Sequence, residues 1–343
     1  MTTLKDLSRH LNLSVTQVSR ALNDHADVSE ETRRRVKEAA IKLKYQPNVA
    51  ARKLVSGRSG IVGLVLPNMP KMAEAPIFVQ TVGGMSAHFA RRRMQFVLNI
   101  ADESEPILEI YRRLISGGSL DGFVLLEPVR DDPRIEFLQS QKVPFVVHGR
   151  DREEPDYPYF DIDNFGVAHR LTRYLTDQGH RRIAFLNGRE GLTFVEARRE
   201  GYRSALGEAG LRYDPHLHLC ADMEEGFGII SAVRLFSENP RPPTAVIAGN
   251  LRIAKGLYDA LRAMHLSVPQ DVSVVAHDDL LPDIKANAFD PPLTTTQSAL
   301  ELSWEPLAEF LAGAVANVPA AALQKLGELR FVERESVAPP QQP

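Results

Sequence analysis

Seven short apolar runs, separated by stretches with helical spacing, are the strongest constraint on the fold of this 343-residue chain. Continuous apolar runs that alternate with helices are typical of parallel strands buried on both faces. Because the pattern restarts near residue 160, we expect two doubly wound α/β lobes with a cleft at the carboxyl ends of their strands. The runs are IVGLVL (61–66), FVLNI (96–100), DGFVLL (121–126), PFVV (144–147), RIAFL (182–186), TAVIA (244–248) and VSVVA (272–276).

The charge of the chain is distributed unevenly along its length. Residues 1–60 carry a net charge of +6, whereas the remainder carries −9. A basic segment of this size is typical of a nucleic-acid contact, because Lys and Arg side chains displace the counterions condensed on phosphates. Charge alone favours a solvated helix face, so the pattern of residues in this segment has to decide.

The first helix signal of the chain comes directly after its N-terminus. Thr3 can cap a helix in which Leu4, Leu7 and Leu11 repeat at spacings of three and four and form one apolar stripe. Asn12 tolerates the left-handed backbone of a tight turn, and we expect the helix to end there.

A second helix over residues 15–22 follows at once, because Ser14 and Gln17 form a capping box. Its outward face carries hydroxyl, amide and guanidinium groups, which are the groups that a recognition helix uses to read base edges. A third helix with its own N-cap follows, and a proline breaks the pattern after it. The order of helix, short turn and helix predicts a helix-turn-helix domain over residues 1–46.

The strings TQVSRALN, VSEETRRRV and YQPN, at their separations in this chain, resemble the LacI/GalR family of bacterial transcriptional regulators. One departure is Asn12, which stands where most members have a turn glycine. The resemblance implies a sequence-specific DNA-binding regulator, not an enzyme, in which Val15, Thr16 and Arg20 read the major groove. The contacts with double-stranded operator DNA implied for this domain are Thr3, Val15, Thr16, Gln17, Ser19, Arg20 and Asn23.

The resemblance also implies that residues 47–59 contain a hinge helix that forms on operator DNA. The string NVAARKLVS is too short for a stable isolated helix in water, so its ordering would await a partner. Leu54 would be the wedge inserted into the minor groove, with Ala51 packed close by and Asn48 as a further DNA contact. The alternative is a plain linker helix.

The resemblance continues through residues 60–337, which are similar in architecture to periplasmic sugar-binding proteins. The landmarks are GHRRIAFLNG, EARREGYRSAL, PTAVIAGN, DVSVVAHDD and PPLTTT. They imply an effector-binding and dimerisation domain whose chain crosses three times between the lobes. The expected first lobe covers about 60–159 and 295–323, the second about 160–294 and 324–337, and residues 338–343 are a tail.

A neutral polyol needs hydrogen-bond donors and acceptors in pairs, and guanidinium and carboxylate groups supply them in bidentate form. Arg198, in R-R-E-G-Y, matches the family's effector-binding arginine in R-x-x-G-[FYW]. Asp278 matches the acceptor in G-[FY]-D-[DN], from which Ala276 and His277 depart. We expect its neighbour Asp279 to cap the following loop.

Further effector-binding positions are implied in both lobes. Asn250 matches the asparagine of the family's N-D-x-x-A, although Leu251 replaces the aspartate. For any one of these residues, a structural hydrogen bond or core contact is an alternative to ligand contact. The matching first-lobe positions are Phe78, His148 and Arg150.

Cysteine usage and motifs bound the compartment and the chemistry. Cys220 is the single cysteine, no zinc-ligand spacing occurs, and cofactor and nucleotide-hydrolysis motifs are lacking. We therefore expect no metal site and no cofactor. The N-terminus lacks a secretory apolar region and no run reaches about 18 apolar residues, so we expect a cytoplasmic protein that does not contact membranes.

These observations together predict a sugar-responsive transcriptional regulator. The C-terminal SVAPPQQP lacks heptads, which indicates a homodimer rather than a tetramer. We expect a repressor of a carbohydrate uptake or catabolism operon, with an α-glucoside as the first choice of effector because similar regulators often serve disaccharide operons. The alternative is an intracellular sugar-binding receptor without DNA function.

Overall fold

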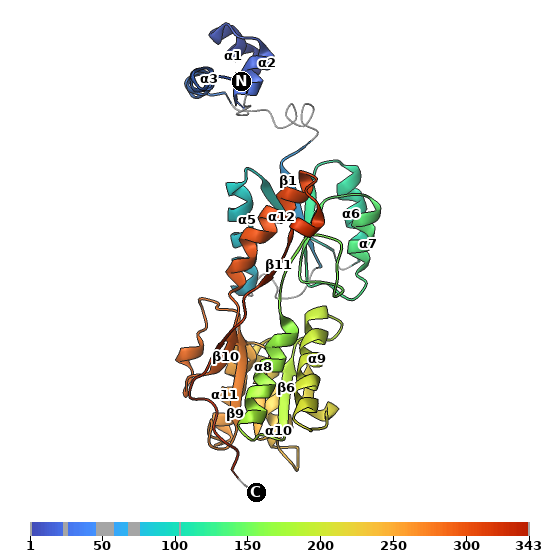
Figure 1. Cartoon of the computed structure of the whole chain (residues 1–343), viewed down its shortest axis with the longest axis vertical. Coiled ribbons are helices and arrows are strands. Elements are labelled where there is room, and N and C mark those ends of the chain that lie inside the picture. The colour runs from blue at the N-terminus through green and yellow to red at the C-terminus, as the bar shows by residue number, and fades with distance from the viewer. Residues whose placement is uncertain (1, 23–26, 46–57, 68–75, 103, 342–343) are drawn as a thin grey trace. The chain divides into compact units, whose positions relative to one another are not determined.

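The computed structural model describes residues 2–22, 27–45, 58–67, 76–102 and 104–341 (Figure 1). The chain divides into two compact units, Met1–Gly60 and Ile61–Pro343. The predicted hinge positions Asn48, Ala51 and Leu54, and the predicted DNA contact Asn23, lie outside the described residues.

The first unit contains the three predicted helices, α1 (Leu4–Leu11), α2 (Val15–Leu22) and α3 (Glu30–Lys42). The three helices contact one another pairwise around one small core. Each is too short to be stable alone in water, so this shared core is what holds them in the helical state. Its buried members are Leu7, Val18, Ala21, Val36 and Ala39.

Side-chain caps begin the helices where the sequence predicts. Thr3 and Asp6 form a capping box at α1, in which the amide of Thr3 donates to the Asp6 carboxylate over 2.8 Å. The left-handed turn is at Asn12, with φ 53°. At α2 the amide of Gln17 donates to Ser14 Oγ over 3.1 Å, and the amide of Ser14 donates to Gln17 Oε1 over 2.9 Å. Each capping box therefore gives a partner to two backbone amides at the start of its helix.

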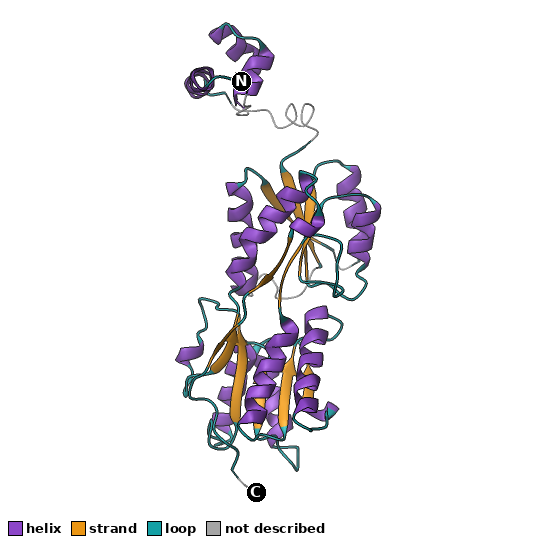
Figure 2. Cartoon of the chain, viewed as in Figure 1, coloured by secondary structure: helices purple, strands orange, loops and turns teal. Residues whose placement is uncertain are grey.

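The second unit contains two six-stranded, mostly parallel sheets, which confirms the predicted architecture (Figure 2). All seven predicted strands are present. The first sheet has the order β11 (Gln324–Gly327), β5 (Tyr159–Ile162), β4 (Phe145–His148), β3 (Gly122–Leu126), β1 (Ile61–Leu66), β2 (Gln95–Ile100). The second has the order β12 (Arg330–Val332), β10 (Thr294–Gln297), β9 (Ser273–Asp278), β8 (Ala245–Ala248), β6 (Ile183–Asn187), β7 (His218–Cys220).

Helices cover both faces of each sheet, which explains the continuous apolar strands. On the first sheet, α5 and α12 bury one face and α6 and α7 the other; on the second, α8 and α9 bury one face and α10 and α11 the other. Their bounds are α5 (Pro76–Arg91), α6 (Ile107–Ser116), α7 (Pro133–Ser140), α12 (Trp304–Val315), α8 (Asn164–Asp177), α9 (Thr193–Glu208), α10 (Glu225–Phe236) and α11 (Leu251–Ala263).

The chain crosses between the sheets three times, each time a few residues after the predicted boundaries near 160, 295 and 323. Strands β5 and β11 pair with each other in the first sheet, and β10 pairs with β9 in the second. Each of these strands completes its pairing before the chain leaves its sheet, and single-sequence patterns do not reveal that register. The predicted tail begins with Ala338, whose amide donates to Ser273 Oγ over 3.1 Å.

Within the described part of the chain, no helix is both long and apolar enough to cross a membrane. In the same residues, no three His, Cys, Asp or Glu side chains are grouped so that they could hold a metal ion.

The contact between α8 and α9 depends on the absence of a side chain at Gly201. A Cβ atom there would lie 2.1 Å from the carbonyl oxygen of Phe165. We expect Gly201→Ala to lower the free energy of unfolding by about 1–3 kcal/mol, because the two helices have to move apart. Gly207 is the matched control on the same helix, since a Cβ there meets nothing within 4 Å. Urea unfolding that shows equal effects for the two alanine variants would contradict this account of the helix contact.

Candidate functional site

Helix α2 presents the side chains predicted to read DNA on the outside of the first unit. Val15 is 40% exposed, Thr16, Gln17 and Arg20 are exposed, and Ser19 is half-buried. Gln17 Oε1 is engaged in the capping box, which leaves its amide nitrogen for an outside partner. The face opposite the core is therefore polar and accessible, as a major-groove reader requires.

Arg20 is paired in the free chain with Asp27, a residue that the sequence did not suggest. Its Nη2 lies 2.7 Å from Asp27 Oδ2, and its Nε donates to Asp27 Oδ1 over 3.2 Å. The two side chains are 46% and 56% exposed, and exposed ion pairs contribute only about 0–1 kcal/mol. The pair orients the guanidinium, but it is weak enough for Arg20 to leave Asp27 and bind a phosphate or a guanine base.

In the second unit, Arg198 is a charged group held almost completely out of water at 4% exposure. Its Nε donates to Asn164 Oδ1 and its Nη1 to the carbonyl of Gly249, each over 2.9 Å, and the guanidinium lies 5.2 Å from the ring centre of Phe194. Burial lowers the pKa of Arg198 to about 10, so the group remains protonated at neutral pH. Among the described residues, its Nη2 makes no hydrogen bond and is available for a ligand.

A continuous set of hydrogen bonds joins Arg198 to the predicted first-lobe residue Arg150. Arg150 Nε donates to Asp161 Oδ2 over 2.9 Å, and Asn164 Nδ2 donates to Asp161 Oδ1 over 3.2 Å. Burial raises the pKa of Asp161, and the hydrogen bond and charge of Arg150 oppose this rise. Asp161 and Asn164 are functional candidates that the sequence analysis missed. They stand at the end of β5 and the start of α8, where no motif marks them.

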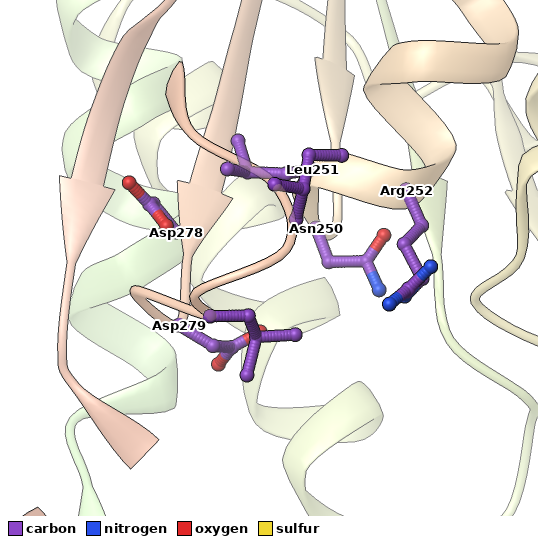
Figure 3. Close-up of a pocket in the computed structure, with 7 residues that line it drawn as sticks. Asn250, Leu251, Arg252, Asp278 and Asp279 are labelled. Atoms are coloured by element: carbon purple, nitrogen blue, oxygen red, sulfur yellow. The ribbon is translucent and has the colours of Figure 1, made fainter. Parts of the chain in front are cut away.

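The corner of the second sheet near Asn250 forms a small pocket (Figure 3). Asn250 begins α11, and its Oδ1 accepts from the amide of Ile253 over 2.9 Å while its Nδ2 donates to the carbonyl of Met223 over 3.1 Å. Leu251 is 3% exposed and belongs to the core. The side chain of Asn250 is thus already used as a helix cap, and Leu251 adds no polar group to the pocket.

The structure reverses the expected roles of Asp278 and Asp279, whose side chains point to different sides of the chain in Figure 3. Asp278 is the loop cap, because its Oδ1 accepts from the amide of Leu280 over 2.8 Å and its Oδ2 accepts from Gln297 over 3.1 Å. The charge of Asp279 instead acts, together with that of Asp161, on Arg198 and on His148, where both carboxylates oppose the lowering of the pKa by burial. The reason is that consecutive residues at a strand end face opposite sides, which sequence matching does not resolve.

Two hollows adjoin these carboxylates. The pocket shared by Asn250, Asp278 and Asp279 has a volume of about 10 Å³, which is room for about one water molecule. A second hollow of about 280 Å³ lies beside Asp278, Gln297 and Arg334.

The remaining first-lobe candidates differ in their placement. His148 ends β4, stacks on Phe160 at 6.1 Å between ring centres, and has a pKa lowered by burial despite the opposing charges of Asp161 and Asp279. Phe78 is half-buried in α5 and takes part in none of the contacts described above for this cluster. The structure thus brings together Arg150, Arg198, His148 and Asp279, and leaves Phe78 outside the set.

Comparison with known proteins identifies the family. Residues 3–48 match the bacterial regulatory proteins of the lacI family, and residues 172–337 match the periplasmic binding protein-like domain. The chain is 39% identical over 338 residues to the HTH-type transcriptional regulator AglR of Rhizobium meliloti (strain 1021), covering 98% of this chain and 94% of that protein. The chain belongs to the LacI family.

Other members of the LacI family agree with this assignment. The HTH-type transcriptional regulator RafR of Escherichia coli is 34% identical over 82% of each chain. A transcriptional regulator CelR–cellobiose complex has a TM-score of 0.70 and 31% identity, covering 98% of this chain and 100% of that one. The Lac repressor dimer bound to operator, with a TM-score of 0.78 and 21% identity over 98% of this chain and 99% of that one, shows the same fold.

Membership in the LacI family makes this protein a DNA-binding transcriptional regulator, and its relatives are regulators rather than enzymes. This confirms the family predicted from the sequence. It also contradicts the alternative of a receptor without DNA function.

Proposed function

We propose that this LacI-family regulator is a repressor of a carbohydrate uptake or catabolism operon, and that a neutral sugar bound between its lobes controls its affinity for operator DNA. The observation that carries the proposal is the pairing of two incompletely used groups: Arg198 Nη2 as a donor and Asp279 as an acceptor. Vicinal hydroxyls each donate and accept, so a buried guanidinium and a carboxylate whose charges act on each other suit a sugar.

For DNA recognition we propose that α2 enters the major groove. Val15, Thr16 and Arg20 would contact base edges, while Gln17, Ser19 and Thr3 would contact phosphates or hold the helix in place. One small three-helix unit buries too little surface for specific binding at cellular salt, which is why we propose that the protein acts as a homodimer on two half-sites. We propose that the protein acts in the cytoplasm, where it would meet its operator DNA.

The segment outside the described residues completes this proposal. Asn48 and Ala51 would contact the DNA backbone and groove near the operator centre, and Leu54 would insert between base pairs there. Effector binding would alter the relative rotation of the lobes and so the distance between the two hinges of the dimer. A few kcal/mol of differential affinity is enough for such a switch.

For the effector we propose a disaccharide-sized glucoside, with α-glucosides as the first choice. A CelR structure with cellobiose shows that a 31% identical relative binds a glucose disaccharide. Around Arg198, the proposed contacts are Asp279, Arg150 and His148, while Asn250 and Asp278 shape the pocket through the α11 cap and the loop cap.

An electrophoretic mobility shift with DNA from upstream of the gene tests the function directly. We expect a complex whose affinity falls by about 1,000-fold or more between about 50 and 200 mM salt, because several phosphate contacts release counterions. Maltose, trehalose and cellobiose are added in separate lanes, and we expect one of them to dissociate the complex. A sugar that tightens the complex would contradict the repressor and inducer assignment, and the absence of any complex at low salt would contradict the function itself.

Leu54→Ala tests the minor-groove wedge. We expect operator affinity to fall by about 10-fold to 100-fold, because the wedge stabilises the kinked duplex, while affinity for random DNA stays within about twofold. Fluorescence anisotropy with both duplexes measures the two affinities. Equal losses on the two DNAs would show that Leu54 acts only as a general part of a linker helix.

Arg198→Ala tests the effector site. We expect sugar affinity to fall by between about 10-fold and 100-fold, because a hydrogen bond from a charged donor is lost, while operator affinity without sugar stays within about twofold. Isothermal titration calorimetry gives the sugar affinity, and circular dichroism confirms that the variant is folded. An unchanged sugar affinity would place the effector site elsewhere.

A further inference from the structure

His277 is the most completely enclosed imidazole of the second unit, at 0% exposure within strand β9. Its Cα partner in the neighbouring strand β10 is Thr296, and its Nδ1 lies 3.0 Å from Thr296 Oγ1. Its Nε2 lies 3.4 Å from Asp279 Oδ1, and among the described residues this buried nitrogen has no hydrogen-bond partner. The ring is therefore anchored at Nδ1, and its Nε2 lies within ion-pair distance of the Asp279 carboxylate.

Asp279 is the carboxylate in this corner whose oxygens remain available. Asp278 accepts from Leu280 and Gln297, and the Asn250 oxygen accepts from Ile253. By contrast, no hydrogen bond to the Asp279 carboxylate oxygens is found among the described residues, and His277 Nε2 lies 3.4 Å from Oδ1. An incoming hydroxyl donor would thus find Asp279 before the other acceptors.

The charges around Asp279 keep it ionised. Burial raises the pKa of Asp279, but the imidazole of His277 and the positive potential of Arg198 and His148 more than offset burial, so the pKa lies below its usual value. The neighbouring carboxylate of Asp278 carries the same negative charge, and burial raises the pKa of Asp278. A carboxylate that stays charged in a partly enclosed site accepts strong hydrogen bonds.

We propose that His277 is a positioning residue that holds Asp279 in the orientation in which it accepts a hydroxyl of the sugar effector. This inference rests on the proposed function of the cleft. Thr296 would donate to Nδ1, so the proton of the ring would be on Nε2 and could be donated to Asp279. The imidazole would thus link Thr296 of β10 to Asp279, the first residue after β9. Position 251 has a leucine, buried in the core, where the family motif N-D-x-x-A has an aspartate. Asp279 is therefore the principal anionic acceptor beside Asn250.

His277→Phe tests the role, because phenylalanine fills a similar volume and removes both ring nitrogens. The matched control is His180→Phe: His180 is 2% exposed and its Nδ1 lies 2.9 Å from Thr244 Oγ1, the same pairing at a distance from the proposed site. We expect His277→Phe to weaken sugar binding by about tenfold or more, and His180→Phe to change it by less than about twofold. Binding of maltose, trehalose and cellobiose is measured by calorimetry.

A conservative variant separates positioning from packing. In His277→Gln, the amide nitrogen can still donate to Asp279 and the amide oxygen can still accept from Thr296, so we expect the variant to recover most of the affinity lost in His277→Phe. Wild-type affinity in His277→Phe, an equal loss in His180→Phe, or no recovery in His277→Gln would each overturn the proposal.

A measurement without any sugar distinguishes failure of this inference from failure of the proposed function. Nitrogen-15 NMR of the histidine-labelled full chain, which has 10 histidines, reports the tautomer of each ring, and the signal absent from His277→Phe identifies His277. We expect the Nε2–H tautomer, with a shift of that resonance in Asp279→Asn. The Nδ1–H tautomer would overturn the positioning role. If the wild-type protein binds none of the three sugars, the proposed effector is wrong, and the tautomer still decides the relation of His277 to Asp279.

Discussion

The buried guanidinium of Arg198 is the constraint around which the second unit is arranged. Removing such a charge from water costs several kcal/mol unless acceptors compensate, so its Nε and Nη1 need fixed partners. Asn164 and the carbonyl of Gly249 supply them, and they come from the start of α8 and the end of β8. Through Asn164 and Asp161 the same set of hydrogen bonds reaches Arg150. A ligand that engages the free nitrogen of Arg198 therefore acts on residues of both sheets.

The first unit solves a different problem, because its helices are short. Eight-residue helices lose more conformational entropy than their few hydrogen bonds return. The capping boxes at Thr3 and Ser14 satisfy amides that have no partner within the helix, and the shared core of Val18, Leu7 and Val36 supplies the remaining stability. The result is a rigid α2 with its polar residues turned away from the core, which suits a helix that has to present a fixed surface to a groove.

Sequence reasoning was most reliable where one local pattern decides one local structure. The apolar runs that became β1 to β4, β6, β8 and β9 needed only their composition and spacing, and the caps needed only Thr3, Ser14 and their partners three residues on. It was less reliable at β5, β10 and β11, because the lobe to which each of these strands belongs depends on the strand with which it pairs. Arg198 was found from a motif, whereas Asp161, Asn164 and Asp27 have no motif and were found only through the atoms they contact.

The sequence by itself determined the alternation of strands and helices and the helix-turn-helix with its caps. These depend on neighbours within a few residues, where backbone geometry leaves few choices. Only the tertiary structure decided that Asp278 caps a loop while the charge of Asp279 acts on Arg198, and that Asn250 is used as a helix cap. The direction of a carboxylate at a strand end is set by competition between partners from distant segments, such as Gln297 and His277, which meet only when the strands pair.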